Sequence, residues 1–504
     1  MFDFTPLARP LLSRYAAADL RAATDPEYFQ RTLLQKLLSR AAHTRWGREH
    51  GYGSITSYEQ FREHVDITPY DRLREMVMDM VAGKPDLLWP GTTRRFAQSS
   101  GTSDGRSKFI PVTGASLHRS HYRGATSVVS HYLNLYPGSR LFGGRSLILG
   151  GSFANGLNLP PGSHARVGDL SANLIEAINP MAEFFRVPGR RLALMADWEK
   201  KLPLLAEAAA RADITNISGV PSWMHGVLRE VLRITGATML HEVWPRLEVF
   251  FHGGISMKPY RALYDSIIDP ARMRYLETYN ASEGFFAVQD TIESQAMLLL
   301  LDAGTFYELA RPDGSAPVIP VWEACQGDVY SLIISSCNGL WRYPLGDTVR
   351  IESTSPLRIT IAGRTRHFIN AFGEEVMVHN TDAALSQACR KTGAHALNYT
   401  AAPVYTTSRS RGRHEWIIEF DREPADLEDF AETLDLALQN ENSDYQAKRA
   451  GGIFLDRLTV IKGRPGLFDR WLSSTGKLGG QRKVPRLSND RNIIDRLLRM
   501  NNNI

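Results

Sequence analysis

The sequence predicts a mixed α/β protein, with a large N-terminal unit followed by a smaller α/β unit. Apolar runs of strand length alternate with helical patterns between about residues 140 and 350, which favours a largely parallel sheet covered by helices. A second series of helices and strands follows residue 365. Hydrophobic residues make up 43% of the chain and charged residues 22%, as in an average soluble globular protein.

The first 90 residues are predicted to be helical. Apolar residues recur every three or four positions in 31–46, as one buried helix face requires. The pattern returns in 54–65, after a Ser/Thr start, and in 70–83, before a glycine stop. A Ser/Thr/Gly-rich stretch, 89–113, then lies between two short strand-like runs.

The middle of the chain carries the alternating pattern. Strands are expected at 145–153, 213–223, 246–254, 274–284 and 329–343, with helices at 202–212 and 222–235 between the earlier ones. The segments 340–351 and 356–370 look like strands joined by turns, which predicts a small β-barrel-like subdomain.

A domain boundary is expected near Gly363–Gly373, which divides the chain into 1–365 and 366–504. The second part reads as a helix, two strands, a helix, a strand at 452–461, a glycine-rich loop and a basic terminal helix. With 504 residues and about 150 residues per domain, the larger part is expected to contain several subdomains.

Composition excludes several classes of function. The net charge is +5 (59 Lys and Arg minus 54 Asp and Glu), which is weak support for nucleic-acid binding. Cys325, Cys337 and Cys389 are too few and too scattered for a disulfide framework or a four-thiolate zinc site. There is neither a leader pattern nor an apolar run of about 18 residues, so we expect a cytoplasmic protein without a membrane or nucleic-acid partner.

The strongest local signal is the loop Ser99-Ser100-Gly101-Thr102-Ser103-Asp104-Gly105-Arg106-Ser107-Lys108. Small residues allow the backbone to curl around an anion, so that amides and hydroxyls donate to phosphate oxygens and a lysine adds charge. The loop is not a Walker P-loop, because Lys108 does not directly follow the second glycine. The alternative is an ordinary flexible loop.

Two further segments follow strands. In 277–284, Tyr279 could stack on a base, Ser282 could reach a phosphate and Glu283 could hold Mg²⁺; the alternative is a partly buried tyrosine with a surface glutamate. In 341–347, Asp347 after Gly346 could accept hydrogen bonds from ribose hydroxyls; the alternative is a turn-forming Gly-Asp pair.

Two basic segments complete the set. Gly363-Arg364-Thr365-Arg366 could be a hinge, or solvated charge beside a strand. Lys483, in the glycine-rich stretch 479–486, could approach a site in another domain, or belong to a basic surface loop. The chain lacks the HExxH and GxGxxG patterns of other enzyme classes.

Together the segments SSGTSDGRSK, YNASE and RYPLGD, in this order, resemble the three nucleotide motifs of the auxin-responsive Gretchen Hagen acyl-acid amido synthetases, within the adenylate-forming superfamily. Sequence segments outside these motifs also match, including SGVPSWM, FFHGG and GQRKVPR. The resemblance runs over nearly the whole chain. It implies an N-terminal adenylation domain, a mobile C-terminal domain, and ATP and Mg²⁺ as cofactors.

The resemblance also implies residue roles. Ser99, Ser100, Gly101, Thr102 and Ser103 would hold the ATP phosphates with Lys108 nearby, and Gly253 and Gly254 would line the adenine edge. Tyr279 would pack on adenine, Ser282 would reach a phosphate, Asp347 would hold the ribose beside Arg364, and Glu283 would bind Mg²⁺. Lys483 and Glu283 would be the catalytic residues.

The chain departs from the plant pattern. It has Phe372-Gly373-Glu374-Glu375 where plant members carry an Asp-Lys-Thr-like stretch, which indicates a bacterial-type member without a lysine at that position. Three functions remain open at this point: amide synthesis from a carboxylic acid and an amino acid or amine, thioester formation on CoA or a carrier protein, and a degenerate nucleotide-binding regulator. A monomer is expected, with an oligomer left open.

Ring side chains mark the segments expected to line an acyl-acid pocket. His121 and Tyr122 follow the Ser/Gly loop, and Phe153 and Trp223 belong to 150–225. They suit an aromatic or alkyl acid, and the alternative is ordinary burial in the core.

Overall fold

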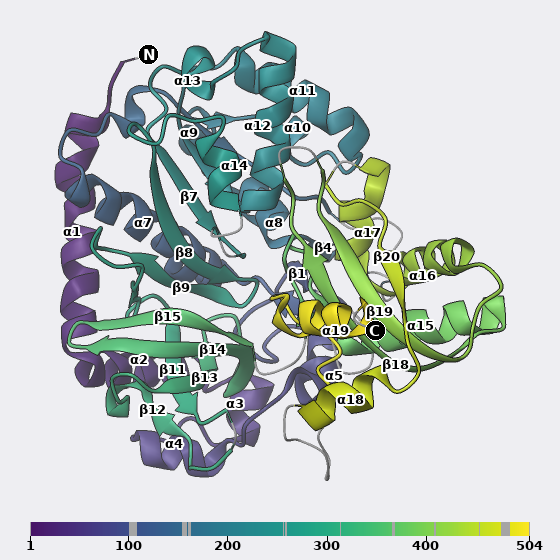
Figure 1. Ribbon diagram of the computed structural model, residues 1–504. Coiled ribbons are helices and arrows are strands. Elements are labelled where there is room, and N and C mark those ends of the chain that lie inside the picture. The colour runs from purple at the N-terminus through teal and green to yellow at the C-terminus, as the bar shows by residue number, and fades with distance from the viewer. Residues whose placement is uncertain are drawn as a thin grey trace.

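The computed structural model describes residues 2–99, 108–153, 159, 163–255, 257, 260–312, 314–364, 368–407, 410–452, 454–474 and 484–502. In this part of the chain, a large N-terminal domain of mixed sheets is followed by a separate α/β C-terminal domain (Figure 1).

A twelve-stranded sheet forms the centre of the N-terminal domain, in the order β12-β11-β13-β14-β15-β10-β9-β8-β7-β6-β3-β5. Its strands from β5 to β8 pair in parallel and its strands from β8 to β12 pair antiparallel. The bounds are β3 Arg145–Ile148, β5 Arg186–Val187, β6 Ile214–Gly219, β7 Val249–Gly253, β8 Arg274–Ala281, β9 Gly284–Gln289, β10 Met297–Leu299, β11 Thr305–Ala310, β12 Ile319–Pro320, β13 Val329–Ser336, β14 Tyr343–Thr354 and β15 Leu357–Arg364.

The sequence patterns therefore locate these strands, but the sheet combines parallel and antiparallel pairs where a largely parallel sheet was expected. The segments predicted as a small barrel-like subdomain, 340–351 and 356–370, contribute β14 and β15 to the antiparallel half of the same sheet. The pairing of β10 explains why the sheet is continuous. This strand pairs with β9 on one side and with β15 on the other, so it joins β14 and β15 to the rest of the sheet.

A second sheet of three strands, β2-β1-β4, carries the predicted phosphate loop between its first two strands. β1 (Arg95–Ser99) and β2 (Lys108–Pro111) are antiparallel, and Ser99 lies opposite Lys108. β4 (Arg166–Gly168) pairs with β1 in parallel.

Helices cover both faces of the large sheet. Along β7, Val249 and Phe251 belong to one buried cluster and Phe250 to the other, because successive strand side chains point to opposite faces. The N-terminal helices, predicted from their spacing, pack in the first cluster, and α11 and α12 pack in the second (Figure 1). The helices are α1 Thr5–Thr24, α2 Pro26–Ala41, α3 Arg45–Glu49, α4 Tyr58–His64, α5 Tyr70–Val81, α6 Gly114–Ser116, the π-helix η1 Leu117–His121, α7 Tyr122–Leu135, α8 Leu170–Ala177, α9 Pro180–Glu183, α10 Arg190–Ala193, α11 Trp198–Ala210, α12 Pro221–Thr235, α13 Leu240–Val243 and α14 Arg261–Asp265.

The C-terminal domain is built on the sheet β18-β19-β20, to the right in Figure 1. Its core is continuous with the second cluster of the N-terminal domain, since Phe250 and Trp416 belong to the same buried group. The predicted strand at 452–461 begins later, at Thr459. The elements are β16 Phe368–Ile369, β17 Val376–Met377, α15 Val378–Thr392, β18 His395–Val404, β19 Arg413–Arg422, α16 Leu427–Glu441, α17 Ser443–Arg449, β20 Thr459–Gly463, α18 Leu467–Ser474 and α19 Asn492–Asn502.

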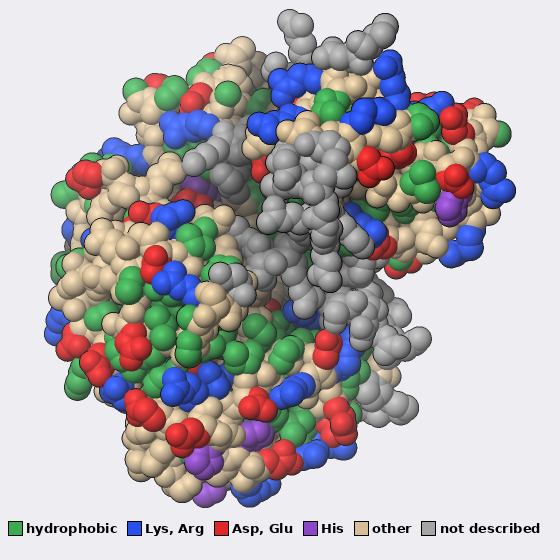
Figure 2. Space-filling view, turned by 60° about the horizontal axis from the view of Figure 1, so that its bottom comes forward, with side chains coloured by type: hydrophobic (Ala, Val, Ile, Leu, Met, Phe, Trp, Pro, Cys, Tyr) green, Lys and Arg blue, Asp and Glu red, His purple; other side chains and the backbone are tan. Residues whose placement is uncertain are grey.

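The surface shows mixed charge. On the face seen in Figure 2, lysine and arginine side chains are interspersed with aspartate and glutamate, which fits the small net charge. Over the described ranges, no helix combines the length and the apolar character that crossing a bilayer would require.

Candidate nucleotide and acyl-transfer site

Four of the predicted site residues come together where the strands of the two sheets meet. Tyr279 lies near the end of β8, Glu283 follows that strand, Asp347 lies on β14, and Lys108 begins β2. Gly253 ends β7, the parallel neighbour of β8, so the group sits at the carboxyl edge of the parallel strands. Ligands of open α/β sheets bind at this edge.

Tyr279 and Asp347 are joined directly. The phenol of Tyr279 donates a hydrogen bond of 2.7 Å to Oδ2 of Asp347, and both side chains are buried. An aromatic ring and a carboxylate thus lie side by side at this edge of the sheet. Asp347 also lies opposite Arg364 in the β14–β15 ladder, so these residues are neighbours in the backbone.

Glu283 is held by its backbone and by one phenol. Its carbonyl accepts a hydrogen bond of 2.9 Å from Nδ2 of Asn338, which fixes the turn between β8 and β9. Its Oε1 lies 3.4 Å from the hydroxyl of Tyr343, the donor of that bond. Only 8% of Glu283 is exposed.

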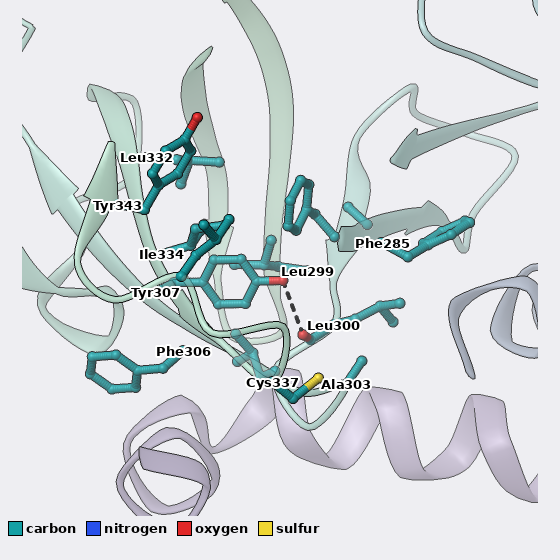
Figure 3. Packing of buried hydrophobic residues seen from close by; sticks show 14 of the residues in the cluster. Phe285, Leu299, Leu300, Ala303, Phe306, Tyr307, Leu332, Ile334, Cys337 and Tyr343 are labelled. Atoms are coloured by element: carbon teal, nitrogen blue, oxygen red, sulfur yellow. Dashed lines mark hydrogen bonds between the residues drawn. The ribbon is translucent and has the colours of Figure 1, made fainter. Parts of the chain in front are cut away.

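Tyr343 connects Glu283 to the phosphate-loop lysine. Nζ of Lys108 donates to the Tyr343 hydroxyl at 2.9 Å, so the small sheet and the large sheet share a polar contact. Figure 3 shows Tyr343 at the margin of the apolar cluster, with its hydroxyl pointing away from Leu332 and Ile334. Deeper in that cluster, the hydroxyl of Tyr307 donates to the carbonyl of Leu300 at 3.4 Å.

The electrostatics of the site follow from burial. Desolvation raises the pKa of the Glu283 carboxyl above the usual range, and the nearby Lys108 opposes that effect. The negative charges of Glu375 and Asp347 add to the upward shift. A cation beside Glu283 would therefore stabilise its ionised form.

The two glycines at the end of β7 and directly after it lie next to the chain that leads into the C-terminal domain. A Cβ at Gly253 would lie 2.5 Å from the carbonyl oxygen of Thr278, so the close approach of β7 to β8 requires glycine. Gly254 has a φ of +82°, and its carbonyl accepts a bond of 3.5 Å from Nδ2 of Asn370. Ser282 lies half-buried in the turn before Glu283.

Several predicted residues lie outside the described ranges. These are Ser100, Gly101, Thr102 and Ser103 of the phosphate loop, and Lys483 near the C-terminus. For Ser99 and Arg364 the structure describes the backbone, which ends β1 and β15 respectively.

The ring side chains expected in an acyl pocket have separate contacts. The hydroxyl of Tyr122 donates to the carbonyl of Leu174, and the guanidinium of Arg166 lies 4.2 Å from the ring of Phe153. Both ring nitrogens of His121 are buried without a hydrogen-bond partner, and burial lowers its pKa to about 4. Trp223 packs against Phe454 of the C-terminal domain.

Sequence reasoning missed Tyr343 and Asn338 as site residues. Tyr343 belongs to the RYPLGD segment, yet its role depends on Lys108, which is 235 residues away. In the same segment Arg342 has a structural role: its guanidinium forms buried hydrogen bonds of 2.9–3.1 Å with the carboxylate of Glu308.

The donor set suits a divalent cation shared with phosphates. Within the described ranges, no group of three or more His, Cys, Asp or Glu side chains could cage a metal ion. Mg²⁺ at nucleotide sites takes one or two carboxylates and completes its shell with phosphate oxygens and water. Glu283 could supply one such carboxylate, and the ammonium of Lys108 is joined to it through Tyr343.

Comparison with solved structures shows that the fold is shared with other proteins. The GH3.15 acyl acid amido synthetase in complex with 2,4-DB superposes with a TM-score of 0.61 and 17% identity, covering 97% of this chain and 96% of that chain. A 2-hydroxyisobutyryl-CoA ligase in complex with 2-HIB-AMP and CoA superposes with a TM-score of 0.57 and 14% identity, covering 93% and 91%.

Sequence comparison identifies the family of the chain. Indole-3-acetic acid-amido synthetase GH3.6 of Arabidopsis thaliana is 29% identical over 97 residues, which are 19% of this chain and 16% of that protein. Family models match most of the chain: the GH3 family N-terminal domain at 20–155 and 164–273, its central domain at 298–364 and its C-terminal domain at 379–492. The chain therefore belongs to the GH3 family and has the fold of its acyl acid amido synthetases.

Proposed function

We propose that the protein is an ATP-dependent acyl-acid amido synthetase. It activates a carboxylic acid as acyl-AMP with release of pyrophosphate, and then transfers the acyl group to an amino acid or amine. The observation that carries this proposal is the convergence of Tyr279, Glu283, Asp347 and Lys108 at one sheet edge. Membership of the GH3 family supports it.

The nucleoside is assigned to the Tyr279 side of the site. Tyr279 packs on adenine, with Gly253 and Gly254 along the edge of the base, and Asp347 accepts hydrogen bonds from the ribose. The direct contact between Tyr279 and Asp347 supports this assignment, because the base and the sugar of a nucleoside are adjacent. Arg364, opposite Asp347 on β15, flanks the ribose.

The phosphates are assigned to the Lys108 side. Lys108 supplies positive charge, the hydroxyls of Ser99, Ser100, Thr102, Ser103 and Ser282 donate to phosphate oxygens, and the backbone at Gly101 leaves room for them. Glu283 holds Mg²⁺, which when bound offsets the charge that develops on the phosphoryl oxygens. Burial raises the pKa of Glu283, and a cation bound beside it would offset the cost of its ionised form.

Two half-reactions require two arrangements of the domains. A carboxylate is a poor acyl donor, whereas acyl-AMP has AMP as its leaving group. We assign Lys483 to the first step, near the α-phosphate, and expect 366–504 to rotate against 1–365 before the amine enters. In the present arrangement the loop from Asn370 to Glu375 faces the site: Asn370 bonds Gly254, and the charge of Glu375 acts on Glu283.

Thioester formation on CoA is the second candidate. The similarity in fold to a CoA ligase, whose structure holds 2-HIB-AMP and CoA, supports this candidate. A regulator that binds nucleotide without turnover is a weaker third candidate, because Glu283 and Asp347 are both present and placed together.

One assay separates the three. Purified protein is incubated with ATP, Mg²⁺ and a broad panel of carboxylic acids, and pyrophosphate is measured; products with amino acids or with CoA are then identified by mass spectrometry. We expect acid-dependent pyrophosphate and an amide. A thioester instead would support the second candidate, and tight ATP binding without pyrophosphate would support the third.

A further inference from the structure

A buried guanidinium nitrogen lies beside the residues assigned to the phosphates. Arg74 is in the second turn of α5, and in the described part of the chain its Nη2 is buried without a hydrogen-bond partner. The side chain as a whole is half-buried, so a ligand can reach it. A group that is always charged needs acceptors where water is excluded. This unused donor is therefore a candidate contact for an anion.

A second arginine shows what a structural role looks like. The guanidinium of Arg342 donates to the carboxylate of Glu308 and, at 2.7 Å, to the carbonyl of Val65. Its donors are thereby satisfied, and it ties the start of β14 to β11 and to the chain before α5. Nη2 of Arg74 has no equivalent bond, so the fold does not account for this donor.

The ring of Tyr70 brings Arg74 close to Lys108. Tyr70 begins α5, and Arg74 lies one helical turn later on the same side, with its Cζ 5.7 Å from the centroid of the ring. Nζ of Lys108 lies 5.8 Å from the same centroid. Aromatic rings stabilise nearby cations through their faces, so one buried tyrosine holds two positive groups near each other.

Tyr70 is fixed against the strand that carries Lys108. Its hydroxyl accepts a hydrogen bond of 2.7 Å from the backbone N–H of Phe109, the residue after Lys108 in β2. Burial raises the pKa of the Tyr70 phenol, the charge of Arg74 lowers it and the charge of Glu283 raises it. The start of α5 therefore lies within electrostatic range of the group of residues assigned to metal and phosphate.

The residues assigned to the nucleotide form a series of contacts that ends at Arg74. Asp347, assigned to the ribose, adds to the upward shift that burial causes in the pKa of Glu283. A phenol joins Glu283 to Lys108, and the ring of Tyr70 joins Lys108 to Arg74. ATP has the same order, from the ribose through the α-phosphate to the β- and γ-phosphates. The end of the series therefore corresponds to the β- and γ-phosphates.

We propose that Arg74 binds the β- and γ-phosphates of ATP and the pyrophosphate that they become. This inference rests on the proposed adenylation step. In that step an oxygen of the acyl carboxylate bonds to the α-phosphorus, the bond from the α-phosphorus to the bridging oxygen breaks, and pyrophosphate leaves with the electron pair. The bridging oxygen gains negative charge as that bond breaks, so a guanidinium at the leaving group stabilises the change. A planar guanidinium can also donate two hydrogen bonds to one phosphate.

The test compares ATP with AMP, because AMP lacks the two phosphates assigned to Arg74. Each nucleotide is titrated into the full chain by calorimetry, with Mg²⁺ and without a carboxylic acid. For Arg74→Met we expect the Kd for ATP to rise about tenfold or more and the Kd for AMP to stay within about twofold of the wild-type value, since a charge-assisted bond is lost. Arg74→Lys, which keeps the charge, should recover part of the affinity for ATP.

Arg72→Met is the matched control. Arg72 lies two residues earlier on the same helix, is exposed, and pairs with Asp66 at 3.3 Å. Surface ion pairs of this kind contribute little, so both Kd values should stay within about twofold of the wild-type values. The same loss of ATP affinity in Arg72→Met and Arg74→Met would show an effect of net charge alone and overturn the assignment.

The remaining outcomes separate this proposal from the proposed function. Unchanged ATP binding by Arg74→Met, or equal losses for ATP and AMP, would overturn the assignment of Arg74 while amide synthesis stands. A wild-type protein that releases no acid-dependent pyrophosphate would overturn the adenylation step, and the two titrations would still decide whether Arg74 binds the phosphates.

Discussion

The hydroxyl of Tyr279 donates to Oδ2 of Asp347 across 68 residues of sequence, at 2.7 Å and away from bulk water. The bond aligns the end of β8 with β14, so the proposed adenine and ribose contacts are held in one place. Because both partners are buried, loss of the donor leaves a carboxylate oxygen without its phenol.

Tyr279→Phe removes that donor and keeps the ring. We expect the KM for ATP in acid-dependent pyrophosphate exchange to rise about three- to tenfold, and the free energy of unfolding to fall by about 1–2 kcal/mol. Denaturant titration measures the second quantity. An ATP KM within the error of the wild-type value would show that the bond does not organise the nucleotide site.

Glu283→Gln is expected to separate activity from stability. Loss of the only proposed metal carboxylate should slow pyrophosphate release by about 100-fold or more. Without metal or nucleotide the variant should be more stable than the wild type at pH 7, because the amide is neutral where the wild type must bury a charge.

The contribution of Glu283 to the free energy of unfolding depends on pH with a definite sign. Burial raises the folded-state pKa of Glu283 above the 4.5 of an exposed glutamate, so its favourable contribution is complete below pH 4.5 and is lost as pH rises through the folded-state pKa. The stability advantage of Glu283→Gln should therefore grow from pH 4.5 toward pH 7. A constant difference across this range would contradict the assigned effect of burial.

Arg342 and Glu308 form a buried ion pair that also receives the hydroxyl of Tyr58 at 2.9 Å. Arg342→Met should lower the free energy of unfolding by about 3–5 kcal/mol, because the Glu308 carboxylate would remain buried without its partner. The double variant with Glu308→Leu should lose less than the single variant. A larger loss of stability in the double variant than in Arg342→Met, measured by thermal or chemical unfolding, would argue against an unpaired charge as the cause.

Glu374 organises the loop between the domains. Its carboxylate accepts the backbone N–H of Phe372 at 2.6 Å and lies 2.8 Å from Nε2 of His414, with both side chains fully buried. Glu374→Ala should lower the free energy of unfolding by about 3 kcal/mol or more, whereas Glu374→Gln, which keeps an acceptor for the amide, should recover part of this. Equal losses in the two variants would exclude a hydrogen-bonding role.

Local patterns determined much of the fold. The spacing of apolar residues located the N-terminal helices and α12, and short apolar runs located β6, β7 and β8, because periodicity and strand length are properties of a few consecutive residues. The mixed character of the central sheet was missed. Whether β15 pairs with β10 depends on register between segments about 60 residues apart, which no local pattern records.

The sequence by itself determined the order of the motifs, the residue types at the strand ends and the resemblance to one family. Only the tertiary structure decided that Tyr343 lies between Lys108 and Glu283. It also decided that Arg342 forms an ion pair with Glu308 and that Lys448 lies over the ring of Trp223. The physical reason is that these contacts join residues on different strands, sheets and domains. Their strength depends on burial and distance, which arise only when the chain has folded.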